Sequence, residues 1–458
     1  MARSKWFNSS WQPNVVKYES TDEDLTGAAG LGTMMDLFTA MPQYKSLRNC
    51  LPERSSNASY ETRHLAFMLI CGFWYGYDCL DDLEKFRGDP MVRAKLGEIP
   101  RAKTIGDYLR DFDDENIKDL NQILVQQALE NRRRVGAGTQ IILDIDSTPN
   151  VQSGKKIEGV AWNYKNQWCL DSLLVYDELG FCYGMLLRPG NTFSSLGSEA
   201  MMVDILKNIP EAQRKEVSVR ADSAFCSEDF IRMCLLMGVK FSITAHGNMG
   251  WEDEAKKLTN FKSWTYSKEE KDEALKKGLE LLKVETSFYM YEPGWAPNLK
   301  FPVVVKRSWV KKESEEPASS EIWFWKYYGV ITNRGLYPLT AQDILGFHAK
   351  RGNAENFIKE EKYGYDLKHY PCQKLKANHA YGLLALIASN FLRSLQVLEN
   401  PDKPSYVKKL RHRLIAIPGK LISHSGKAIM KIPATYYKER ESMITAWQAT
   451  LHLSFSTA

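Results

Sequence analysis

The feature that most constrains the fold is the run from Thr139 to Thr148, TQIILDIDST. It begins apolar and β-branched and ends polar, which is typical of a central strand whose carboxyl end opens into a cleft. Asp144 and Asp146 are two residues apart, so on a strand both side chains project from the same face. Two such carboxylates repel each other and are costly to desolvate unless a cation lies between them. Alternatively, one Asp caps the following turn. Capping would account for one of the two acids but less well for both.

A second strand with the same design ends at another acid. Glu216 to Asp222 reads EVSVRAD, with alternating apolar residues before the final Asp. The other elements predicted around these two strands are strands at 167–176 and 181–187, a helix at 195–208, a helix at 227–237 and a strand at 239–244. This order fits a mixed sheet with helices on its faces, and function is expected at the carboxyl ends of its strands.

A helix predicted from Ala354 onward carries a third acid. In the stretch 347–362, FHAKRGNAENFIKEEK, the side chains of Arg351, Glu355 and Lys362 fall within roughly 40° of one another at about 100° per residue. One carboxylate flanked by two cations suits a site for metal and phosphate. An ordinary salt-bridged helix is the alternative, because Arg–Glu and Glu–Lys pairs at these spacings are common.

The candidate ligands are thus all carboxylates: Asp146, Asp222 and Glu355, with Asp144 as a further candidate. Hard oxygen ligands without His or Cys suit Mg²⁺ or Mn²⁺. Two such ions about 3.5–4 Å apart can activate an attacking oxygen and stabilise the leaving oxygen of a phosphodiester. The two cations of the helix would then hold the neighbouring phosphates.

Three motifs follow one another in the chain: LDIDST at 143–148, VRADSAF at 219–225 and RGNAENFIKEEKYG at 351–364. Together they resemble the DDE transposases of bacterial insertion sequences, specifically those with a β-rich insertion between the second Asp and the Glu. That group has a Tyr-Arg-Glu-Lys signature, whose spacing Arg351, Glu355 and Lys362 match. His348 stands at the Tyr position, which is a departure from the family.

The resemblance implies an RNase H-like core in which Asp146, Asp222 and Glu355 are catalytic and bind two Mg²⁺ or Mn²⁺ ions. Asp146 is the expected principal ligand of the first motif, with Asp144 second, because Asp146 directly precedes a Ser-Thr pair as in the family. The signature positions His348, Arg351 and Lys362 are the expected DNA contacts. These six residues, with Asp144, make up the candidate active site.

The resemblance also implies a cut-and-paste reaction on double-stranded DNA. Water would first cut one strand at the transposon end. The freed 3′-hydroxyl would then attack the opposite strand, typically through a hairpin, and later the target DNA. The implied partners are the terminal inverted repeats and the target, with a homodimer holding two ends together.

The sequence therefore predicts a multi-domain α/β protein with an RNase H-like mixed sheet flanked by helices. The expected divisions are a mostly helical DNA-binding region at 1–135, the first part of the core at 136–246, a β-rich insertion at 247–327, the second part of the core with the Glu helix at 328–398, and a basic region at 399–458. The N-terminal helices could equally be a scaffold or a dimer contact.

The insertion should contain strands at 284–291, 301–310 and 321–332, after a charge-rich helical stretch at 252–283. Half of the 12 tryptophans of the chain fall here. Most are expected to pack against the sheet, while one or two could stack on an unpaired base.

Positive charge is concentrated near the C-terminus. The net charge of +5 says little about partners, but 393–440 holds eleven Lys or Arg residues against three Asp or Glu. This local excess could bind a polyanion. The candidate contacts to DNA in this region are Lys408, Lys409, Arg411 and Arg413.

Cysteine spacing and hydropathy argue against other classes. The eight cysteines form no CxxC pair and have no His at zinc spacing, which favours reduced thiols over a disulfide framework or a zinc module. The N-terminus has no apolar signal region. The most apolar run, 379–398, carries Asn390 and Arg393, which predicts a buried core helix and no membrane span. A bacterial cytoplasmic, nucleoid-associated protein is expected.

Two other functions share these features. An RNase H-like nuclease that does not join strands would show the same acids but would not need Arg351 and Lys362 at this spacing. A non-catalytic relic that binds DNA and represses its own element is the second alternative. The intact set of three acids argues against the relic.

Overall fold

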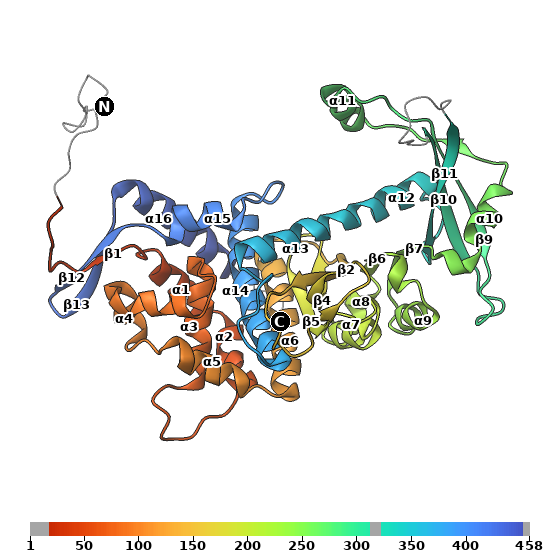
Figure 1. Cartoon of the computed structure of the whole chain (residues 1–458). Helices are drawn as coiled ribbons and strands as arrows, with labels where there is room; N and C mark the ends of the chain where they lie inside the picture. The colour runs from red at the N-terminus through yellow and green to blue at the C-terminus, as the bar shows by residue number, and fades with distance from the viewer. Residues whose placement is uncertain (1–17, 312–321, 452–458) are drawn as a thin grey trace.

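The computed structural model describes residues 18–311 and 322–451. Figure 1 shows an elongated molecule: helices from both chain ends gather on one side, a mixed sheet with helices occupies the middle, and a β-rich arm lies at the far end. The line of α12 (Ala341–Ala349) and α13 (Asn353–Gly364) connects the arm to the middle. The mixed α/β class predicted from the sequence is confirmed.

The core sheet has the predicted order of three antiparallel strands followed by two parallel ones. Its antiparallel strands are β2 (Ile141–Val151), β4 (Trp168–Asp177) and β5 (Cys182–Pro189), with the short β3 (Ala161–Trp162) at the edge of β4. Next to β2 lie the two parallel strands β6 (Val217–Ala221) and β7 (Lys240–Thr244). The β-branched apolar run at the start of β2 is buried between the layers, as expected of a central strand.

The insertion extends this same sheet. Its strands are β8 (Lys262–Ser263), β9 (Val284–Tyr291), β10 (Phe301–Lys311) and β11 (Trp323–Thr332). β11 pairs with β10 over most of its length and with β7 at its end, where Val330 lies opposite Thr244. The expected boundary after residue 327 therefore falls inside one continuous strand, and the arm is joined to the core by backbone hydrogen bonds.

The predicted helical stretch at 252–283 is broken into short pieces. It contains α10 (Trp251–Lys256) and α11 (Lys268–Lys277), with β8 between them. Lys262 of β8 pairs with Thr286 of β9, so this short segment is drawn into the arm as an edge strand. The other helices on the core and arm are α7 (Ser198–Lys207), α8 (Glu211–Arg214) and α9 (Glu228–Leu236).

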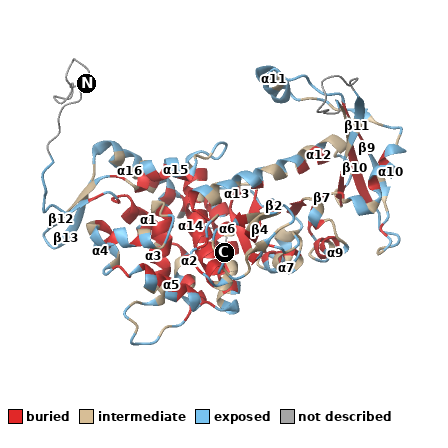
Figure 2. Cartoon of the chain, viewed as in Figure 1, coloured by how far each residue is buried: buried red, intermediate tan, exposed pale blue. Residues whose placement is uncertain are grey.

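A helical body surrounds α14 (Leu375–Glu399), which Figure 2 shows buried along most of its length. The helices of its N-terminal part are α1 (Leu31–Thr39), α2 (Pro42–Leu47), α3 (Thr62–Tyr75), α4 (Pro90–Leu96), α5 (Ala102–Arg110) and α6 (Asp114–Arg134). Trp74 donates its indole N–H to the Ala388 carbonyl (3.0 Å). α3, α5 and α6 all pack on α14, as a scaffold would, and DNA recognition by this region stays a prediction.

Among the described residues, α14 alone is long and apolar enough to cross a membrane, and 89% of that stretch is buried within the protein. The expectation of a core helix is therefore confirmed. The C-terminal part adds α15 (Val407–Leu410), the hairpin β12 (Gly419–His424) and β13 (Lys427–Lys431), and α16 (Ala434–Leu451). β12 pairs with β1 (Leu25–Thr26), which joins a segment of the N-terminal part to the C-terminal hairpin. All eight cysteines are free.

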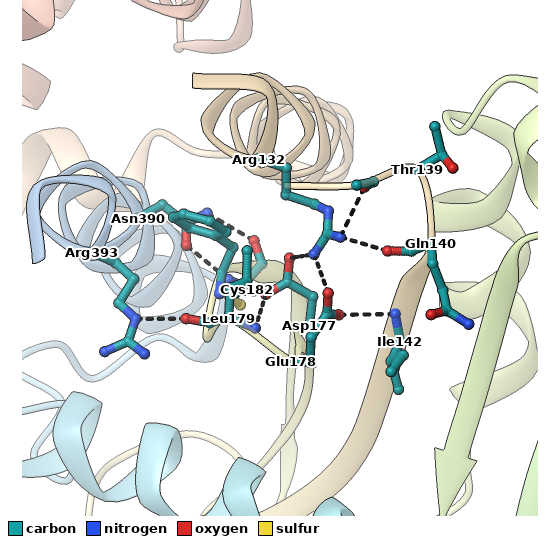
Figure 3. Close-up of polar contacts among 12 residues, drawn as sticks. Arg132, Thr139, Gln140, Ile142, Asp177, Glu178, Leu179, Cys182, Asn390 and Arg393 are labelled. Carbon is teal, nitrogen blue, oxygen red and sulfur yellow. Dashed lines mark hydrogen bonds and ion pairs between the residues drawn. The ribbon is translucent and has the colours of Figure 1, made fainter. Parts of the chain in front are cut away.

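The turn between β4 and β5 anchors the start of β2 (Figure 3). Buried Arg132, near the end of α6, donates to Asp177 (2.9 Å) and to Glu178 (2.8 Å). Glu178 also accepts from the backbone N–H of Ile142 in β2 (3.0 Å). The side-chain amide of Asn390 in α14 accepts from the backbone N–H of Cys182 in β5 (2.7 Å) and donates to its carbonyl (2.8 Å). The strand that carries the first acids is thus tied to α6 and α14.

A buried carboxyl, Glu361, lies where α13 packs on α14. Ser389 donates to its Oε1, while Oε2 has no hydrogen-bond partner among the described residues. Burial raises the pKa of Glu361 to about 8, with Glu360 adding to the rise and Ser389 opposing it. The carboxyl is therefore protonated in the folded protein at neutral pH.

The stability of the protein should consequently fall between about pH 4.5 and pH 8, because only the unfolded chain releases the Glu361 proton in that window. Through this group, each rise of one pH unit lowers the free energy of unfolding by at most about 1.4 kcal/mol. Glu361→Gln should reduce the slope of the unfolding free energy against pH, measured by urea unfolding across this range. Glu269→Gln, on the exposed face of α11, serves as the control and should keep the wild-type slope. A Glu361→Gln slope equal to wild type would show that the carboxyl is already ionised when folded.

Candidate active site

The two acids of β2 lie in different surroundings. Asp144 is fully buried, and its two oxygens accept from Nε and Nη2 of Arg220 in β6, both at 2.6 Å. Asp146, two residues further along the same face, is only partly buried and accepts from the backbone N–H of Ser147 (2.9 Å). A guanidinium occupies both oxygens of Asp144, which argues against the predicted metal contact of this residue. Asp146 is the acid available to a ligand.

Asp222 lies beside Asp146 at the end of β6. The parallel register pairs Asp144 with Arg220, and two residues later each chain segment reaches an acid on the same face, Asp146 in β2 and Asp222 directly after β6. Asp222 begins a short 3-10 turn and accepts from the backbone N–H of Ala224 (2.9 Å). Adjacent strands lie roughly 4.8 Å apart, so the two carboxylates are neighbours.

Arg351 connects the aspartates to the third acid. Its Nη1 is 3.5 Å from Oδ2 of Asp146, and its Nη2 is 3.9 Å from Oε1 of Glu355 in the first turn of α13. The Glu355 side chain is 68% exposed, whereas those of Arg351 and Asp146 are 20% and 17% exposed. Two of the three predicted acids, Asp146 and Glu355, therefore contact one guanidinium, and the charge of the third, Asp222, acts on Asp146.

The electrostatics of Asp146 favour a cation. Burial raises its pKa to about 6, Arg351 lowers it, and the charges of Asp222 and Glu355 raise it further. Negative charge is thus already unfavourable here, and a positive ion would relieve it. Over the residues that the structure describes, no three His, Cys, Asp or Glu side chains are close enough to hold an ion without movement. Coordination by all three acids requires the exposed Glu355 to turn from Arg351 toward the aspartates.

Lys362 continues the line of charged groups along β2. Its ammonium donates to the Thr148 hydroxyl (2.6 Å) and to the Pro149 carbonyl (2.7 Å), two to three residues past Asp146. Burial lowers the pKa of Lys362 to about 8, against the opposing charges of Asp171 and Asp146. The ammonium therefore lies on the same side of the sheet as the acids, held by polar groups of the strand.

The match to a protein family covers almost the whole chain. The family described as Transposase DDE domain group 1 matches residues 9–452. The chain belongs to this family of DDE transposases. Members of the family bind DNA and generally use divalent metal ions. No curated protein matches this transposase in sequence.

His348 of the transposase is not placed as a DNA contact. It is 1% exposed, its Nδ1 lies 3.1 Å from both the carbonyl and the hydroxyl of Ser242, and its Nε2 lies 3.0 Å from the Thr244 hydroxyl. Burial and the neighbouring Arg351 and Arg220 lower the pKa of His348 to about 4. The ring is neutral and both nitrogens are bonded inside the protein, which argues against the predicted phosphate contact.

Two of the four basic residues predicted near the C-terminus are engaged inside the transposase. Arg411 is buried and donates to the backbone carbonyls of Trp74 (2.9 Å) and Phe73 (2.6 Å), which argues against its predicted DNA contact. Arg413 forms ion pairs with Glu399 and Glu439. Lys408 and Lys409 are exposed on α15 and remain candidate DNA contacts.

Arg220 is the residue of the site that the sequence interpretation missed. It belongs to the motif VRAD and precedes Asp222 by two residues, which places both side chains on one face of a strand. A buried arginine needs acceptors for its N–H groups, and a carboxylate also balances its charge. The alternation of Arg and Asp in β6, read together with the two acids of β2, could have indicated that one of those acids is its partner.

Proposed function

We propose that this transposase cleaves DNA at the ends of its mobile element and joins the freed 3′ ends to target DNA, assisted by two divalent metal ions. The observation that carries the proposal is the placement of Asp146 and Asp222 on adjacent strands beside Glu355. Carboxylates that share a surface with fixed cations suit the transfer of a phosphodiester.

Asp146, Asp222 and Glu355 would hold the ions. Their oxygens are the hard ligands that Mg²⁺ and Mn²⁺ prefer, and a positive ion would offset the burial and like charges that raise the pKa of Asp146. When bound, such ions lower the pKa of an attacking water or hydroxyl and stabilise the leaving oxygen. Asp144 stays paired with Arg220 and supports the strand.

The cations of the site would bind DNA. Arg351 would hold the phosphate next to the scissile one through its two-pronged guanidinium, once Glu355 turns to the aspartates. Lys362 can exchange its contacts with Thr148 for a neighbouring phosphate. Lys408 and Lys409 would extend the contact along the duplex without reading its sequence.

The reaction proceeds as successive exchanges of one phosphorus–oxygen bond for another. Water attacks one strand at the element end and releases a 3′-hydroxyl; this hydroxyl attacks the opposite strand to give a hairpin; after opening, it attacks the target. Two copies of the chain hold the two element ends together. We place this activity at the bacterial nucleoid, where the element and its targets lie.

The test is a strand-transfer assay with purified protein, a labelled duplex carrying the element end, a supercoiled plasmid target and Mg²⁺. The expected products are nicked or hairpin ends and labelled plasmid, none of which form with EDTA or with Glu355→Gln. Cleaved ends without labelled plasmid would favour the RNase H-like nuclease. Binding without any cleavage would favour the non-catalytic repressor.

A further inference from the structure

Tyr328 lies on the same face of the sheet as the candidate acids, although it belongs to the strand that comes from the insertion. β11 places Val330 opposite Thr244 of β7, and Asp222 follows β6 at the level of Thr244. Because side chains alternate along a strand and neighbouring strands are in register, Tyr328, Thr244 and Asp222 share the face on which Asp146 lies. The arm therefore contributes a side chain to the face of the sheet that carries the acids, two strands away from Asp222.

A chain of hydrogen bonds connects Tyr328 to the protein interior. Its hydroxyl is 2.9 Å from Oγ1 of Thr244, which is 3.0 Å from Nε2 of His348. Nδ1 of His348 is 3.1 Å from the carbonyl oxygen of Ser242. His348 is 1% exposed and Tyr328 is 40% exposed, so the chain runs from the core to the surface.

The Ser242 carbonyl sets the direction of the bonds in this chain. The Ser242 hydroxyl also lies 3.1 Å from Nδ1 of His348, but a hydroxyl can donate or accept, whereas a carbonyl only accepts. An unprotonated Nδ1 would turn its lone pair toward the carbonyl oxygen at 3.1 Å, so we assign the proton to Nδ1. Burial together with Arg351 and Arg220 keeps the imidazole neutral. Nε2 then accepts from the Thr244 hydroxyl, whose oxygen in turn accepts from Tyr328. The phenol proton is directed inward, and the lone pairs of the phenol oxygen are left for a group outside.

We propose that Tyr328 contacts the DNA substrate at the rim of the active site and accepts a hydrogen bond from an uncharged donor. This inference rests on the proposed function, because it requires DNA at the acids. Phosphate oxygens only accept, so they do not fit this hydroxyl unless its bond to Thr244 breaks. The donors that DNA offers are the N–H groups of bases and a terminal 3′-hydroxyl. Tyr328 thus selects the substrate by hydrogen-bond pattern, while Arg351 and Lys362 bind its charge.

The test measures Kd for a pre-cleaved element-end duplex by fluorescence anisotropy, without added metal, for wild type and Tyr328→Phe. In a series of duplexes, each member lacks the exocyclic amine of one base, and that base is a different one of those next to the cleaved bond in each member. A further duplex lacks the terminal 3′-hydroxyl. We expect one of these changes to weaken wild-type binding roughly three- to ten-fold and Tyr328→Phe binding not at all. The duplex that responds identifies the donor. The salt dependence of affinity should be the same in both proteins, because no phosphate contact is lost.

Two variants serve as controls. Tyr327→Phe changes the neighbouring residue on the opposite face of β11. It should lose affinity for the same modified duplex as wild type does. Thr244→Val keeps the phenol but removes the oxygen that orients it, so discrimination should be lost. Retained discrimination in Tyr328→Phe or Thr244→Val, or a shallower salt dependence in Tyr328→Phe, would overturn the inference. If wild-type protein does not prefer element ends to unrelated DNA, both the proposed function and this inference are overturned. If wild type binds and cleaves element ends normally but does not differ from Tyr328→Phe across the duplexes, this inference alone is overturned.

Discussion

Asp146→Asn, Asp222→Asn and Glu355→Gln are each expected to slow DNA strand cleavage on the order of a thousandfold. Each change keeps the size of the side chain but removes the charge that would hold a divalent ion. The rate is measured on a labelled element-end duplex in Mg²⁺ under single-turnover conditions. DNA affinity should stay near wild type, because none of the three acids is a phosphate contact, and losing like-charge repulsion at Asp146 should not lower stability.

The control for these variants is Asp229→Asn, an exposed acid on α9 away from the site, which should cleave at the wild-type rate. Since the three acids act as one unit, the triple variant should be little slower than the slowest single variant. A single variant that still cleaves normally would show that its residue is wrongly assigned.

Arg220→Ala is expected to lower the free energy of unfolding by about 3–5 kcal/mol, because it leaves Asp144 buried and without its partner. The change also removes the bond from Arg220 to the carbonyl of Phe347 (2.8 Å), which fixes α12 against the sheet. Urea unfolding followed by tryptophan fluorescence measures the loss. Arg110→Ala removes an exposed ion pair with Asp107 and should cost less than about 1 kcal/mol.

Replacing both partners by apolar residues, as in Arg220→Met with Asp144→Leu, should recover most of that stability, since no charge remains buried. A cost for Arg220→Ala no larger than that for Arg110→Ala would contradict a buried ion pair. If Asp144→Asn slowed cleavage as strongly as Asp146→Asn without loss of stability, Asp144 would be a ligand after all.

The strands of this protein were predictable from sequence because their apolar pattern is local. The strand expected at 284–291 is β9, and the order of the core strands is as predicted. The edge segment β8 was missed, because its two residues form a strand only by pairing with Thr286. The division at residue 327 was misplaced, although the strand predicted at 321–332 already crossed it; β11 runs through this position without a break.

The candidate site was predictable in its residue types but not in their roles. Strand period placed Asp144 and Asp146 on one face, and only the fold shows that Arg220 occupies the first of them. Likewise, His348 and Arg411 carry the polar side chains expected at a DNA surface. Their burial depends on β7 and α3, segments distant in the chain.

Anomalous scattering from Mn²⁺ in crystals of the complex with element-end DNA tests most directly whether Asp146, Asp222 and Glu355 share bound ions. We predict anomalous peaks within coordination distance of an oxygen from each of the three acids and of the scissile phosphate, with Asp144 still paired to Arg220. Peaks bound by other residues, or a Glu355 that remains outside the coordination of every ion, would contradict this account.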